Sequence, residues 1–131
     1  MPEWVKPDVL GRSARPGAGA GHGPIPREEV DRWLADARAM GFRSILCLLD
    51  DRQLALYSAL PGGLLEHYQE AGFEVGHVPV PDLQDPPVPP GDLETIGRIF
   101  AGLAKPVLVH CWAGIDRTGA TVEYLLNKME S

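Results

Sequence analysis

Residues 106–119 read PVLVHCWAGIDRTG and pass from a short apolar run into a turn that contains glycine, and then into a helical pattern. The run at 106–110 is apolar enough to be a strand that is covered on both faces. Apolar residues at helical spacing predict a helix over 117–129. The segment 110–119 therefore lies where a strand ends and a helix begins, which is where α/β proteins gather their sites.

The sequence before this segment alternates between helical and strand patterns. Val30, Trp33, Leu34 and Ala37 recur at the spacing of one helix face, and Gly41 is a suitable residue to end that helix. The elements expected along the chain are helix 26–40, strand 44–49, helix 64–71, strand 73–78, helix 92–103, strand 106–110 and helix 117–129.

Strands that alternate with helices predict an α/β fold with a mostly parallel central sheet flanked by helices. Gly- and Pro-rich stretches at 15–26 and 80–91 are expected to be loops. A length of 131 residues suits one domain over 1–131 with one sizeable core.

Composition restricts the class of protein. The chain is 44% hydrophobic and 23% charged, with a net charge of −6. An acidic chain has no general attraction for nucleic acid or anionic lipid. It has no apolar run long enough to span a membrane, and its start lacks the pattern of a signal peptide. We therefore expect a cytoplasmic protein with no nucleic-acid or membrane partner. Two cysteines also argue against a disulfide scaffold.

The strongest chemical signal is the phosphate loop, defined here as residues 111–117, in which five residues separate Cys111 from Arg117. A tight loop that enters a helix directs backbone N–H groups toward one centre and so binds anions. Gly114 permits a backbone conformation that a side chain disfavours, and the guanidinium of Arg117 matches two phosphate oxygens. Cys111 is then placed as a nucleophile beneath the phosphorus. The phosphate is expected to contact Trp112, Ala113, Gly114, Ile115, Asp116 and Arg117.

The order His110-Cys111, five residues, Arg117-Thr118 resembles the signature of the protein tyrosine phosphatase superfamily, and the wider pattern resembles small atypical dual-specificity phosphatases of prokaryotic type. The resemblance implies a dual-specificity phosphatase-like fold and a phospho-Cys111 intermediate, without cofactor or metal. Thr118 is expected to donate its hydroxyl to the sulfur when it leaves. His110 is expected to orient the loop.

A general acid must protonate the leaving oxygen. The segment VPVPD, which ends at Asp82, resembles the acid loop of the small dual-specificity phosphatases, and we place the acid at Asp82. Asp85 is the first substitute, and Asp116 within the phosphate loop is the second. The alternative for Asp82 is that it caps a turn beside Pro81.

The loop carries no lysine that would meet additional phosphates, and Asp116 is negative. Phosphotyrosine, with phosphoserine or phosphothreonine as extras, therefore fits better than a polyphosphate, in a phosphoprotein or a small phosphate ester. The alternatives are a phosphoinositide or inositol-phosphate phosphatase, and a phosphate-binding pseudophosphatase scaffold. A rhodanese-like sulfurtransferase does not require the His, Arg and Thr-Gly context. A zinc site is also disfavoured, because adjacent His110 and Cys111 lack the usual ligand spacing and Cys47 is the only other thiol.

Other residues carry weaker signals. Cys47 is expected in the core, with a redox partnership to Cys111 as the functional alternative. Arg12 and Arg15 are read either as a patch near the phosphate or as members of structural ion pairs.

The resemblance also implies further helices after the last one here, so the chain looks C-terminally short. We therefore hypothesise that self-association into a homo-oligomer, or the N-terminal loop, covers apolar side chains on the last helix, namely Tyr124, Leu125 and Leu126.

Overall fold

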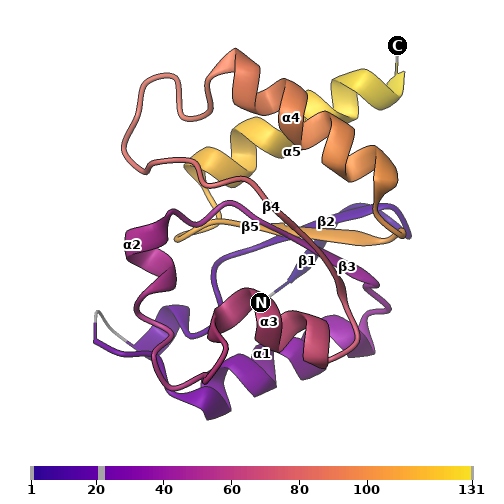
Figure 1. The fold of residues 1–131 in the computed structure, drawn as a ribbon. Coiled ribbons are helices and arrows are strands. Elements are labelled where there is room, and N and C mark those ends of the chain that lie inside the picture. The colour runs from indigo at the N-terminus through magenta and orange to yellow at the C-terminus, as the bar shows by residue number, and fades with distance from the viewer. Residues whose placement is uncertain (1, 21–22, 131) are drawn as a thin grey trace.

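The computed structural model describes residues 2–20 and 23–130 and shows one central sheet between two layers of helices (Figure 1). Its five strands lie in the order β1-β2-β5-β3-β4. The strands β2, β5, β3 and β4 are parallel, and β1 pairs antiparallel with β2. The strand bounds are β1 Glu3–Lys6, β2 Leu10–Ser13, β3 Ser44–Cys47, β4 Glu74–His77 and β5 Val107–His110. The predicted mostly parallel α/β sheet is confirmed, and β5 is its central strand.

The helices lie in two layers. Helices α1 and α3 cover one face of the sheet, while α4 and α5 cover the other (Figure 1). The helix bounds are α1 Arg27–Ala39, α2 Asp51–Leu54, α3 Gly63–Glu70, α4 Pro90–Gly102 and α5 Asp116–Glu130, with a 3-10 turn η1 at Ala18–Ala20. No helix in the described ranges has both the length and the apolar character needed to cross a bilayer.

The sheet divides the core into two clusters because successive strand residues point to opposite faces. On β3, Ile45 and Cys47 pack on the α1 and α3 side, whereas Leu46 packs on the α4 and α5 side. On β5, Leu108 belongs to the first cluster, while Val107 and Val109 belong to the second. Every residue of these two strands is buried, as expected for strands that are covered on both faces.

The differences from the sequence analysis are local. The strand expected over 44–49 ends at Cys47, and each predicted helix lies within two residues of its observed bounds. The strands β1 and β2 and the short helix α2 were not predicted. The expected loop 15–26 contains η1, and its residues 21–22, like residues 1 and 131, lie outside the described part of the chain.

Candidate active site

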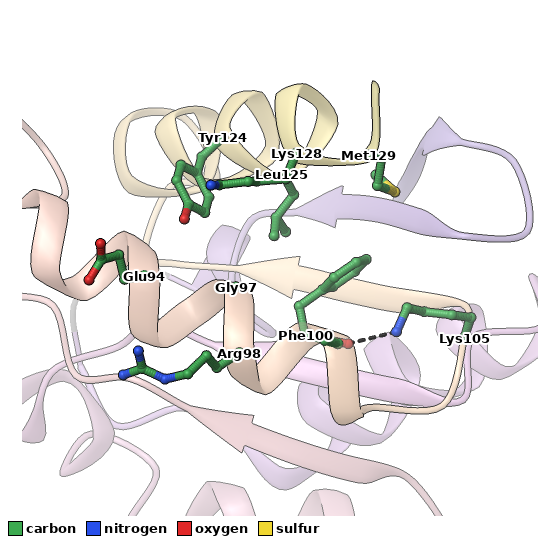
Figure 2. Close-up of a pocket in the computed structure, with 10 residues that line it drawn as sticks. Glu94, Gly97, Arg98, Phe100, Lys105, Tyr124, Leu125, Lys128 and Met129 are labelled. Carbon is green, nitrogen blue, oxygen red and sulfur yellow. Dashed lines mark hydrogen bonds between the residues drawn. The ribbon is translucent and has the colours of Figure 1, made fainter. Parts of the chain in front are cut away.

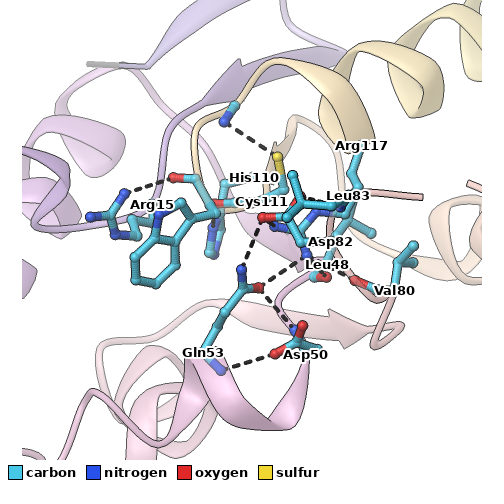
Figure 3. A network of polar contacts seen from close by, with 12 residues as sticks. Arg15, Leu48, Asp50, Gln53, Val80, Asp82, Leu83, His110, Cys111 and Arg117 are labelled. Carbon is cyan, nitrogen blue, oxygen red and sulfur yellow. Dashed lines mark hydrogen bonds and ion pairs between the residues drawn. The ribbon is translucent and has the colours of Figure 1, made fainter. Parts of the chain in front are cut away.

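The phosphate loop joins β5 to α5 at the carboxyl end of the central strand. Cys111 is 2% exposed, and its Sγ accepts a hydrogen bond of 3.3 Å from the backbone N–H of Gly114 (Figure 3). Gly114 has a φ of +75°, and a Cβ at this position would approach backbone atoms of Ser13 and Ala14 to 2.6 Å. Glycine is therefore required for two reasons: its backbone conformation and the close contact with the end of β2.

Arg117 is a buried cation at the start of α5, with a side chain that is 1% exposed. Its Nη1 donates hydrogen bonds to the carbonyl oxygens of Leu48 and Val80 at 3.2 and 2.8 Å, and to Oε1 of Gln53 at 3.0 Å. Its Nη2 lies 3.1 Å from Oδ2 of Asp82 as an ion pair that lacks hydrogen-bond alignment. These acceptors compensate the burial of the charge.

Gln53 connects the arginine to the predicted acid and was missed in the sequence. Its Nε2 donates to Oδ2 of Asp82 at 3.2 Å while its Oε1 accepts from Arg117 (Figure 3). Gln53 is held in turn by a capping box with Asp50, which begins α2. The pattern Asp-x-x-Gln directly after a buried strand is a recognisable helix start, and this signal would have found α2 and its glutamine.

The three carboxylates considered as the acid lie in different surroundings. Asp82 is 29% exposed and is the one that pairs with Arg117. Its Oδ1 also accepts from the N–H of Leu83, so the turn-capping alternative describes one of its two oxygens. Asp85 is exposed in the loop, and Asp116 is exposed at the first residue of α5. The geometry thus brings Asp82 to the arginine, and its role as the acid stays a prediction.

His110 is fully buried between Cys111 and Tyr68. Its Nδ1 lies 3.2 Å from the carbonyl oxygen of Cys111, and its Nε2 lies 2.9 Å from the hydroxyl of Tyr68. Because a carbonyl only accepts, the proton lies on Nδ1, and the hydroxyl of Tyr68 donates to Nε2. Burial, with smaller effects from Arg117 and His77, lowers the pKa of His110 to about 4. A neutral imidazole at pH 7 thus orients the loop's first carbonyl.

Some donors around the loop are buried without a partner. Among the described residues, Nε of Arg117 and Oγ1 of Thr118 are buried and make no hydrogen bond. Thr118 lies in the first turn of α5. Ile115 is 66% exposed and Trp112 is half-buried. Unused buried donors indicate a place for an acceptor.

Arg12 and Arg15 contact the phosphate loop through carbonyl oxygens of its backbone. Nη2 of Arg12 donates to the carbonyl oxygen of Gly114 at 2.8 Å, and Nη1 of Arg15 donates to that of Trp112 at 3.1 Å. They are therefore partners of the loop's backbone.

Cys47 and Cys111 belong to different core clusters. Cys47 pairs with His110 in the β3–β5 register and packs on the α1 and α3 side, whereas Cys111 packs on the α4 and α5 side. Cys47 is fully buried, and its burial raises the pKa of its thiol to about 12. Such a thiol is a poor nucleophile. The arrangement thus gives no support to a disulfide between the two, and the redox partnership stays a prediction.

A groove of about 690 Å³ lies between α4 and α5, away from the phosphate loop (Figure 2). Phe100, Tyr124, Leu125 and Met129 supply its apolar lining, with Lys105 at its rim. Tyr124 and Leu125, two of the three side chains that were expected to be covered by another surface, line this groove. The N-terminal residues that the structure describes are not among its lining, and self-association there stays a prediction.

The protonation of His110 has a consequence for stability. An unfolded histidine titrates near 6.5, whereas His110 in the folded chain titrates near 4. Between these values the unfolded chain binds a proton that the folded chain does not bind. The free energy of unfolding should therefore fall as the pH is lowered from about 6.5 to about 4, by up to about 3 kcal/mol from this residue.

Urea unfolding of the wild type and of His110→Asn at pH 7 and pH 4.5 measures this contribution. The variant should be less stable at pH 7 and should lose less on acidification. An equal loss in both proteins would contradict the prediction, as would an NMR titration of the His110 ring in the folded wild type with a midpoint above pH 6.

A phosphatase family model matches the chain, and solved phosphatase structures share its fold. The family model described as "Tc-R-P: Polymorphic toxin system, DSP-PTPase phosphatase" matches residues 34–129. No curated protein matches the chain. Among solved structures the chain is similar to Tk-PTP in the active form, with 24% identity and a TM-score of 0.65 over 99% of this chain and 75% of that one.

Two further structures share the fold at lower identity. The core catalytic domain of the PP-IP phosphatase SIW14 from S. cerevisiae is 17% identical, with a TM-score of 0.59 over 100% of this chain and 70% of that one. TpbA from P. aeruginosa is 20% identical, with a TM-score of 0.54 over 92% and 59%. The matched range 34–129 includes most of the chain and the whole of the phosphate loop, and so the chain belongs to the DSP-PTPase phosphatase family of polymorphic toxin systems.

Proposed function

We propose that this chain is a cysteine-dependent phosphatase that hydrolyses phosphotyrosine, with phosphoserine and phosphothreonine as further substrates, through a phospho-Cys111 intermediate. The observation that carries the proposal is the buried sulfur of Cys111, which accepts a hydrogen bond from a loop amide, in the same loop as a buried Arg117 that is paired with Asp82. The family supplies the reaction class, phosphatase. The identity of the ester and the role of each residue belong to the proposal.

In the first step the thiolate of Cys111 attacks phosphorus, and the bond from phosphorus to the leaving oxygen breaks. Backbone N–H groups of the loop and the guanidinium of Arg117 stabilise the charge on the three remaining phosphoryl oxygens. Asp82 gives its proton to the leaving oxygen, which departs as an alcohol or phenol. The products of this step are the free alcohol and phospho-Cys111.

In the second step water attacks the phosphorus of phospho-Cys111 while Asp82 takes a proton from that water. The S–P bond breaks, and the sulfur leaves as a thiolate. The hydroxyl of Thr118, which is buried and makes no hydrogen bond to the described residues, is available to donate to that sulfur. Inorganic phosphate is released, and Cys111 and Asp82 return to their starting states.

The ion pair between Arg117 and Asp82 fits this sequence of events. A phosphate oxygen takes over Nη2 of Arg117 and frees the carboxyl of Asp82. Beside a phosphate dianion the neutral form of a carboxyl is favoured, which is the form that an acid catalyst needs. Gln53 contacts both side chains and keeps Asp82 near the arginine during the change.

The surroundings of the loop favour a substrate with one phosphate and an apolar body. The hollow beside Asp82 is lined by further carboxylates, those of Asp50 and Asp51, with Arg52 as its cation. The two large hydrophobic side chains that stand out as exposed in the described structure are Leu83 at 94% and Ile115 at 66%. Leu83 follows the acid and Ile115 belongs to the phosphate loop. Apolar side chains at these two positions suit the ring of a phosphotyrosine.

A panel of substrates tests this preference. The wild type should turn over a phosphotyrosine peptide with kcat/KM at least roughly tenfold above that for an inositol polyphosphate, because additional phosphates meet carboxylates. A peptide of the same sequence with phosphoserine in place of phosphotyrosine measures how much the aromatic ring contributes to kcat/KM. Faster hydrolysis of the inositol polyphosphate would establish the alternative, an inositol-phosphate phosphatase.

Replacing the nucleophile should separate chemistry from binding. Cys111→Ser should give no detectable hydrolysis of an aryl phosphate, since an alcohol is not ionised at neutral pH, while inorganic phosphate still binds by calorimetry. Acid quenching of the wild type during turnover should trap phosphate on Cys111, which mass spectrometry locates. Hydrolysis of the aryl phosphate by Cys111→Ser at the wild-type rate would rule out the mechanism.

Asp82→Asn should lower kcat by roughly a hundredfold or more, as expected on loss of a general acid. The loss should be larger for an alkyl phosphate than for a nitrophenyl phosphate, whose leaving group needs no proton. Asp85→Asn is the matched control in the same loop and should keep kcat within about twofold of the wild type. A large loss of kcat in Asp85→Asn but not in Asp82→Asn would identify Asp85 as the general acid. A loss confined to Asp116→Asn would identify Asp116 as the acid.

A further inference from the structure

The structure describes two arginines that bind the outer side of the phosphate loop. Arg12 on β2 is half-buried and donates from Nη2 to the carbonyl oxygen of Gly114 at 2.8 Å. Arg15 is 6% exposed and donates to the carbonyl oxygen of Trp112 twice, from its backbone N at 3.2 Å and from Nη1 at 3.1 Å. Its guanidinium also lies 3.5 Å from the centre of the Trp112 ring. Two alternate carbonyls of one loop thus each accept from an arginine.

We infer that Arg12 and Arg15 are positioning residues, which hold the phosphate loop in the conformation that binds the phosphoryl group. The inference rests on the proposed function. In a trans peptide the C=O and the following N–H point in opposite directions. Donors that hold the oxygens of Trp112 and Gly114 on the outer side therefore direct the N–H groups of Ala113 and Ile115 to the inner side.

The charge on the arginines adds to the effect of their geometry. A hydrogen bond from a guanidinium to a carbonyl is stronger than one from a neutral donor, and it polarises the peptide so that its N–H becomes a better donor. The loop itself carries the negative Asp116, and its one cation is Arg117. Arg12 and Arg15 supply positive charge behind the loop without occupying the place of the phosphate.

The fold explains why these arginines reach the loop. The strand β2 is parallel to β5, with Ser13 in register with His110, so the segment that follows β2 runs beside the phosphate loop. Trp33 of α1 fixes this segment, because its Nε1 donates to Oγ of Ser13 and to the carbonyl oxygen of Ala14, each at 3.1 Å. The arginines therefore approach the loop from a rigid support.

Binding of tungstate, a stable phosphate analogue, tests the inference in the full chain. Arg12→Gln and Arg15→Gln should each weaken the calorimetric Kd for tungstate by roughly tenfold, the ratio that corresponds to one charge-assisted hydrogen bond. Arg12→Lys keeps the charge and one donor, and it should recover part of the loss. Tungstate should shift the amide NMR signals of Ala113 and Ile115 less in the Gln variants than in the wild type.

Arg43→Gln is the matched control. Arg43 is exposed and directly precedes β3, at the opposite end of the parallel strands, so the variant removes the same charge away from the loop. It should bind tungstate as the wild type does. Gln variants that bind tungstate within twofold of the wild type would overturn the inference, and so would a loss of thermal stability with unchanged affinity. If a Gln variant does not fold, the measurements on Arg12→Lys replace it. Full wild-type affinity for tungstate together with unchanged amide shifts in Arg12→Lys would also count against the inference.

The same measurements separate this inference from the proposed function. A wild type that neither binds tungstate nor hydrolyses an aryl phosphate would refute the proposed function. An active wild type whose Arg12 and Arg15 variants match it would refute the positioning role alone.

Discussion

A guanidinium that is withdrawn from water must be surrounded by acceptors, and the site is organised around this requirement at Arg117. Its partners come from three segments that are distant in sequence: the end of β3, helix α2 and the loop after β4. Leaving one of these acceptors unpaired in the interior would cost several times the value of an ordinary surface contact. The cation therefore fixes where these segments meet, and it does so at the carboxyl end of β5, beside Cys111.

The phosphate loop is supported by polar contacts on its outer side. Arg12 and Arg15 bind its carbonyls, His110 orients the carbonyl of Cys111, and Gly114 lies close to the backbone at the end of β2. Each contact engages an oxygen on the outside of the turn or permits its close approach. In the proposed function, the N–H groups of the loop, the sulfur of Cys111 and the guanidinium of Arg117 are then left to bind the phosphoryl group. The neutral His110 adds orientation without adding charge at pH 7.

The fold could be predicted from the sequence where local patterns were strong. The apolar face of α1 and the buried run of β5 were visible as periodicity, and the order Cys111, five residues, Arg117 located the phosphate loop. The strands β1 and β2 were missed because they mix charged with apolar side chains, so that their pairing depends on the sheet. The roles of Gln53, Arg12 and Arg15 depend on contacts between distant segments, and single-sequence patterns do not encode such contacts.

The proline-rich segment that holds Asp82 differs from the phosphate loop in how firmly it is attached. Residues 81–87 are mostly exposed, and the contacts of Asp82 with Arg117 and Gln53 secure the segment at one point. The phosphate loop is bonded at several of its carbonyls to Arg12 of β2, to Arg15 after that strand and to the buried His110. The segment that carries Asp82 is therefore less firmly held than the phosphate loop that carries Cys111. In the proposed mechanism, adjustment to leaving groups of different size therefore falls to the segment that carries Asp82, and the more firmly bonded phosphate loop keeps its shape.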